Sequence, residues 1–138
     1  MGIGVDIADV ARLAAALDRT PALAERLFVD AERGLPVTSL AARFAAKEAT
    51  IKVLRPVDHQ PDWRSVEVRR DPAGWCTMAL SGRAAVLADQ AGITDLAVSL
   101  THEGDLAAAV VVALCHSDAA SIGQSGTSLA PEELGRDD

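Results

Sequence analysis

The apolar stretch at residues 107–114 constrains the fold more than any other feature of the chain. It reads AAAVVVAL, and its run of β-branched valines indicates a strand. Because successive side chains of a strand point to opposite faces, this strand is apolar on both faces, and both need cover. One short chain with few helices can hardly cover both faces, so we expect a neighbouring protomer to cover part of the sheet.

The order of the other elements predicts the fold class. The N-terminal strand GIGVDI precedes two short helices and a long helix over residues 39–55, which we expect Thr38 or Ser39 to cap and Pro56 to stop. Two hairpins follow, around the turns DPAG and HEGD, with a helix between them. Hairpins in place of repeated strand–helix–strand units indicate an α+β fold, with a mainly antiparallel sheet and helices packed on one side.

Composition and charge limit the function classes. With 138 residues, 49% of them hydrophobic, the chain predicts one domain, residues 1–114, followed by an acidic tail, residues 115–138, whose composition disfavours folding. The net charge of −7 argues against nucleic acid as a partner. No apolar run predicts a membrane span and no leader predicts secretion, so we expect a cytoplasmic protein. Cys76 and Cys115 fit no metal-ligand spacing.

Two carboxylates, one on the first strand and one on the long helix, are candidate functional groups. Ile3, Val5 and Ile7 alternate onto one face of the first strand, which leaves Asp6 on the other face. On the long helix, Glu48 lies on the stripe that carries the large apolar side chains. The sequence therefore offers two acidic groups that could act together.

Two interpretations of these carboxylates stay open at this point. In the structural one, Glu48 pairs with Lys52 one turn later and Asp6 caps the following helix. In the other, both bind Mg²⁺, which needs only one or two protein carboxylates because water and substrate phosphates complete its shell. That interpretation requires a phosphate-bearing ligand, which Arg43, Lys47 and Lys52 of the same helix could contact.

The segment VSLTHE, residues 98–103, brings further polar groups to the end of a strand. Val98 and Leu100 are expected to face the core, which places Ser99 on the opposite face and His102 at the strand end. A histidine in such a position is either a solvated residue or a functional one.

Five blocks of the sequence, taken in order, resemble a known family. They are GIGVDI, FVDAE, SLAARFAAKEATIK, WRSVEV and VSLTHE. In this order they resemble the small 4′-phosphopantetheinyl transferases called holo-acyl-carrier-protein synthases. The resemblance covers residues 2–114, and RFAAKEA is its most specific block. One departure is VLRPVDHQPDW, residues 53–63, which has no glycine where the family commonly has one.

The resemblance implies a reaction and its partners. The phosphopantetheine arm of coenzyme A would pass to a serine of an apo acyl carrier protein, with release of adenosine 3′,5′-bisphosphate. Asp6 and Glu48 match the magnesium ligands of the family, and Lys52 matches a lysine near the pyrophosphate. The family also implies a homotrimer whose active sites are shared between neighbouring protomers.

The resemblance also suggests which residues contact coenzyme A, but it does not identify the base that accepts the serine proton. Arg43 and Lys47 are candidates for these contacts, and Ser99 and His102 match the block on the nucleotide side. Glu48, a metal-bound water or His102 could each accept the serine proton. Two other functions stay open: a magnesium-dependent hydrolase of a nucleotide or coenzyme A, and a non-catalytic module that binds carrier proteins.

A basic face on the first helix is a candidate docking surface for an acidic carrier. Arg12 and Arg19 are seven residues apart and share a face of the helix if it extends that far, and Arg26 could extend the patch. The alternative is an ordinary solvated arginine face.

Overall fold

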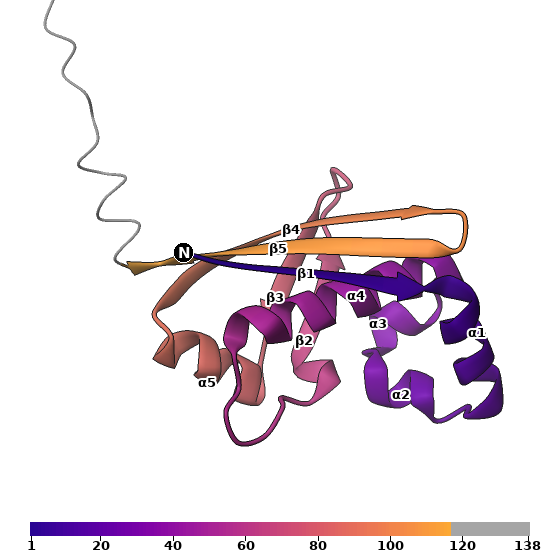
Figure 1. Ribbon diagram of the computed structural model, residues 1–138, viewed down its shortest axis with the longest axis horizontal. Coiled ribbons are helices and arrows are strands. Elements are labelled where there is room, and N and C mark those ends of the chain that lie inside the picture. The colour runs from indigo at the N-terminus through magenta and orange to yellow at the C-terminus, as the bar shows by residue number, and fades with distance from the viewer. Residues whose placement is uncertain (117–138) are drawn as a thin grey trace, which may run out of the picture.

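The computed structural model describes residues 1–116, and Figure 1 shows a sheet with its helices on one side. The strands are β1 (Gly2–Asp9), β2 (Val66–Arg70), β3 (Cys76–Leu80), β4 (Ile93–Glu103) and β5 (Leu106–Cys115). The helices are α1 (Val10–Arg19), α2 (Leu23–Leu27), α3 (Asp30–Arg33), α4 (Val37–Leu54) and α5 (Gly82–Gln90), with a 3₁₀ turn at Trp63–Ser65. The predicted α+β class is confirmed. From residue 117 on, the predicted tail lies outside the described residues.

All strand pairs are antiparallel, as predicted, but the strands form two sheets. One has the order β1-β5-β4, and the other is the β2-β3 hairpin. The valine-rich β5 is therefore the central strand of the larger sheet. Across that sheet Asp6 lies opposite Ala109, and Ala109 lies opposite Leu100.

Helix α4 packs on the inner face of the larger sheet, and most of its residues are buried. Its many alanines allow a close approach, which is tightest at Gly4 of β1. A Cβ at Gly4 would lie 2.1 Å from the carbonyl oxygen of Ala49. Only a glycine leaves room for this approach, which brings the middle of β1 against the middle of α4.

The start of α4 differs from the expectation. Pro36 is the N-cap residue and the helix begins at Val37, so the prediction that Thr38 or Ser39 caps it is wrong. Proline suits this place because its φ, −55° here, is already close to the helical value. The helix ends as predicted, before Pro56, with Arg55 in the left-handed conformation at φ 48°.

The outer face of the larger sheet is apolar and exposed. Ile3, Val5 and Ile7 are 72%, 56% and 64% exposed, and Val110 of β5 follows at 38%. These residues pair across β1 and β5 and so share one face. Within residues 1–116 no helix covers this face, as Figure 1 shows. That a neighbouring protomer covers it stays a prediction.

Candidate active site

The first cluster of functional side chains lies where β1 meets α4. The Nζ atom of Lys52 donates hydrogen bonds to Asp6 Oδ1 at 3.1 Å and to the Val5 carbonyl oxygen at 2.9 Å. Burial raises the pKa of Glu48, and the negative charge of Asp6 raises it further, while Lys52 opposes both. The structure therefore brings Asp6, Glu48 and Lys52 together.

The structural interpretation of Asp6 is wrong. Asp9, not Asp6, caps α1, because its Oδ1 atom accepts a hydrogen bond from the backbone N–H of Arg12 at 2.8 Å. The side chain of Asp6 is 20% exposed and faces α4. Among the described residues Lys52 is its only ion-pair partner, so the carboxylate of Asp6 is directed to α4 and not to the start of α1.

The carboxylate pair has the chemistry of a binding site for a hard cation. Burial, and after it the nearby negative charge of Asp6, raise the pKa of Glu48. A divalent cation bound between the two carboxylates would relieve their mutual repulsion. In residues 1–116 no group of three or more His, Cys, Asp or Glu side chains is placed to hold a metal. The two carboxylates of Asp6 and Glu48 fit Mg²⁺ because this ion accepts one or two carboxylates and takes its other ligands from water and phosphate.

Lys47 is not part of this cluster. Its side chain is completely buried, and its Nζ atom donates to Glu32 Oε1 at 2.7 Å and to the Trp63 carbonyl oxygen at 3.2 Å. Burial lowers the pKa of Lys47, and the hydrogen bond to Glu32 opposes that shift. Lys47 therefore faces the core within residues 1–116, and its predicted contact with coenzyme A has no support in this geometry and stays a prediction.

Glu32, which the sequence analysis did not single out, organises the region around Lys47. It is 1% exposed, and its carboxylate accepts hydrogen bonds from the backbone N–H groups of Val29 at 3.1 Å and Val68 at 3.3 Å, as well as from Lys47. One side chain thereby connects α3, α4 and β2. In the sequence, only its position in the block FVDAE draws attention to Glu32, and that position does not indicate that the side chain is buried.

The second cluster surrounds an open cavity of about 580 Å³ at the other edge of the sheet, beside β4. Arg43, Arg70, Trp75, Ser99 and His102 are among its lining residues. The Nε atom of the Arg43 side chain is buried and lacks a hydrogen-bond partner in the described part of the chain, since the nearest carboxylate oxygen, Oε2 of Glu32, is 3.9 Å away. The cavity thus brings together Arg43, Ser99 and His102, which the sequence assigned to one ligand.

The two clusters lie on opposite edges of one sheet. Asp6 is on β1, whereas Ser99 and His102 are on β4, and β5 runs between these strands, so the edges are about 10 Å apart. None of Asp6, Glu48 and Lys52 lines the 580 Å³ cavity. A single chain therefore does not join the two clusters in one pocket.

A family profile decides the class of protein. The profile described as the 4′-phosphopantetheinyl transferase superfamily matches residues 2–111. The chain belongs to this superfamily.

Relatives and solved structures agree with that assignment to the transferases. The holo-[acyl-carrier-protein] synthase of Clavibacter michiganensis subsp. michiganensis is 49% identical over 111 residues, which are 80% of this chain and 92% of the relative. A coenzyme A complex of the synthase from Chronobacterium ammoniagenes has a TM-score of 0.75 at 30% identity, covering 83% of this chain and 96% of that one. The Helicobacter pylori synthase in complex with coenzyme A has a TM-score of 0.72 at 28% identity, with coverages of 81% and 99%.

Neither of the predicted docking residues of this transferase, Arg12 and Arg19, lines the cavity beside β4. Helix α1 extends to Arg19, as the docking hypothesis requires, and Arg12, Arg19 and Arg26 are all exposed. Among the described residues, no helix is long and apolar enough to cross a membrane.

Proposed function

We propose that this transferase moves the 4′-phosphopantetheine group of coenzyme A to a serine of an apo acyl carrier protein and releases adenosine 3′,5′-bisphosphate. The observation that carries the proposal is the cluster of Asp6, Glu48 and Lys52, two carboxylates and a lysine at one junction of β1 and α4. The relatives named synthases, and the solved synthases that hold coenzyme A, support the same substrate class.

Asp6 and Glu48 would hold Mg²⁺, and Lys52 would bind the pyrophosphate. A Mg²⁺ ion bound there supplies neutralisation of the negative charge that develops on the leaving phosphate. Lys52 is half-exposed on a flexible stem, so its ammonium group can leave Asp6 and donate to a phosphate oxygen. These side chains position and neutralise the pyrophosphate, and phosphoryl transfer needs little more from a protein.

The transfer itself exchanges one phosphorus–oxygen bond for another. The serine oxygen of the carrier bonds to the phosphorus next to pantetheine, the pyrophosphate bond breaks, and the nucleotide leaves with the electron pair. The serine proton goes to a base of the site. Glu48 is one candidate, because its raised pKa makes the carboxylate a better proton acceptor, and His102 and a water molecule of the site are the others.

The nucleotide end of coenzyme A would lie in the cavity beside β4 of a neighbouring copy. Arg43 supplies a buried positive charge for a phosphate, and Ser99 and His102 supply polar contacts. Two copies are needed because the carboxylate cluster and the cavity lie on opposite edges of the sheet. The exposed apolar face of β1 and β5 supports such an assembly, and we propose a homotrimer whose neighbours share each site.

The carrier protein would dock on α1 through Arg12 and Arg19. Both are exposed, and they are separated by about two helical turns on one helix. An enzyme with a net charge of −7 needs a local positive surface to attract an acidic partner, and this face provides one.

The experiment that tests the function is intact-mass analysis of an apo acyl carrier protein incubated with the chain, coenzyme A and Mg²⁺. We expect the carrier to gain the mass of one phosphopantetheine group, and to gain nothing when coenzyme A is omitted. Release of adenosine 3′,5′-bisphosphate with no change in carrier mass would instead identify a hydrolase. A stable complex with an unmodified carrier would identify a binding module.

A further inference from the structure

Trp75 is a large aromatic side chain in an unusual place. It lies at the end of the β2–β3 hairpin, is 73% exposed and lines the cavity beside β4. The only other tryptophan of the chain, Trp63, is half-buried and packs on Phe44 with ring centroids 5.3 Å apart. Trp75 has no ring contact with any described residue. Packing within residues 1–116 therefore gives no reason for a tryptophan at this position.

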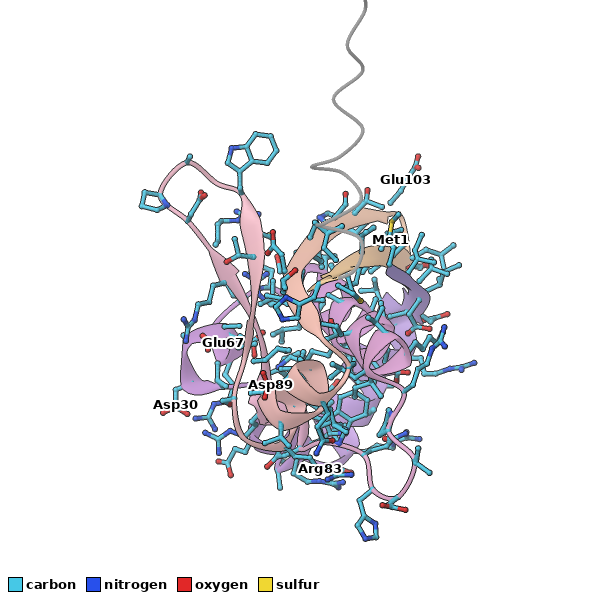
Figure 2. The ribbon with its side chains drawn as sticks, turned by 90° about the vertical axis from the view of Figure 1, so that its left-hand side faces the viewer. Met1, Asp30, Glu67, Arg83, Asp89 and Glu103 are labelled. Carbon is cyan, nitrogen blue, oxygen red and sulfur yellow. The ribbon has the colours of Figure 1, made fainter. Side chains whose placement is uncertain are left out.

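The turn that carries Trp75 is well ordered. The side chain of Asp71 accepts a hydrogen bond from the backbone N–H of Trp75 at 2.9 Å, and the carbonyl oxygen of Asp71 accepts one from the N–H of Gly74 at 2.9 Å. The backbone N–H of Asp71 donates to the carbonyl oxygen of Trp75 at 2.8 Å. Gly74 has a φ of 95°, which suits glycine. The far end of this hairpin extends beyond the helices, as Figure 2 shows. The indole is thus held on an ordered backbone, so little conformational entropy of the loop is lost when a ligand binds.

The other residues that line the cavity indicate what kind of ligand the indole of Trp75 contacts. Arg43 brings a guanidinium whose buried Nε atom has no hydrogen bond within residues 1–116, and Arg70 brings a second positive charge from the end of β2. An exposed aromatic face beside two arginines suits a flat base that carries phosphate, because the base stacks on the ring while the arginines bind the anion. A plain apolar partner would leave Arg70 without a counter-charge in the described part of the chain and the Nε atom of Arg43 without a hydrogen bond.

We propose that Trp75 is a specificity-determining residue that stacks on the purine base of coenzyme A. The proposal rests on the proposed function, in which this cavity takes the nucleotide end of the cosubstrate. Stacking of a base on an aromatic side chain corresponds to a change of about 5- to 150-fold in Kd. Trp75 therefore selects ligands that carry a base, whereas Asp6, Glu48 and Lys52 act on the pyrophosphate.

The test is calorimetric titration of the full chain and its Trp75→Ala and Trp75→Phe variants, without carrier protein. We expect Trp75→Ala to raise the Kd of coenzyme A and of adenosine 3′,5′-bisphosphate about 5- to 150-fold. The Kd of 4′-phosphopantetheine, which lacks the base, stays unchanged, and Trp75→Phe retains most of the affinity for coenzyme A. In a Trp63→Phe background, where Trp75 is the single tryptophan, fluorescence changes with coenzyme A and not with 4′-phosphopantetheine.

Three results would overturn the proposal: an unchanged Kd of coenzyme A in Trp75→Ala, an equal loss for ligands with and without the base, or a change in sedimentation mass, which would assign Trp75 to a subunit interface. The titration contains no carrier, so its outcome is separate from that of the proposed function. A chain that binds coenzyme A through Trp75 and leaves a carrier unmodified would contradict the transfer alone.

Discussion

Replacing Gly4 by alanine tests whether the close approach of β1 and α4 builds the metal site. The new Cβ would lie 2.1 Å from the Ala49 carbonyl oxygen and 3.0 Å from a methyl carbon of Val53. Because carbon–oxygen contacts begin at about 3.3 Å, the strand and the helix must separate by roughly 1 Å. Overpacking of this kind costs about 1–3 kcal/mol of folding free energy. Asp6 is two residues from Gly4 on the same strand face and Glu48 is next to Ala49, so the carboxylates separate as well.

We expect Gly4→Ala to lose both stability and transfer activity. Urea unfolding should show a free energy lower by about 1–3 kcal/mol, and transfer should fall by up to about 100-fold, because a shift of 1 Å in a catalytic group has that effect. Gly2→Ala is the matched control: it lies on the same face of β1, and its Cβ would meet its nearest atom at an ordinary 3.5 Å. If Gly4→Ala keeps the stability and the activity of Gly2→Ala, the close approach does not build the site.

Three further predictions concern the core, the assembly and the carrier. Lys47→Met removes the lysine that pairs with the buried carboxylate of Glu32, so the free energy of unfolding, measured in urea, should fall by about 3–5 kcal/mol. Wild-type stability together with weakened coenzyme A binding would instead indicate that Lys47 contacts the ligand. Val5→Asp puts a charge on the exposed apolar face and should reduce the sedimentation mass to one chain, whereas an unchanged mass would place the interface elsewhere. Arg12→Glu should raise KM for the carrier and leave KM for coenzyme A unchanged; unaltered carrier kinetics at low salt would remove α1 from the docking surface.

The sequence predicted those parts of the fold that depend on local patterns. Alternation of apolar residues identified β1, and proline and glycine marked the helix end at Arg55 and both hairpins. Asp6, Glu48 and Lys52 could be named together because the long helix and the first strand carry them on recognisable faces and the family resemblance joins those faces.

The remaining features depend on contacts between distant segments. Lys47 looks like a surface lysine in the sequence, and only the packing of α3 and β2 around α4 buries it against Glu32. The division into two sheets has the same origin, since hairpin signals specify pairs of strands and do not specify which pairs join. The cavity role of Trp75 also requires β3 and β4 to lie side by side, which no local pattern reveals.

We propose that one active site combines the carboxylate cluster of one copy with the cavity of its neighbour. Asp6→Ala disables the first half and Arg43→Met disables the second with little change in volume, so each variant alone should fail to add mass to an apo carrier. Trimers assembled from an equal mixture contain interfaces in which both halves are intact, and we predict recovery at roughly a quarter of the sites. Mixed trimers that form, as sedimentation and native mass would show, and yet leave the carrier unmodified would contradict the shared site.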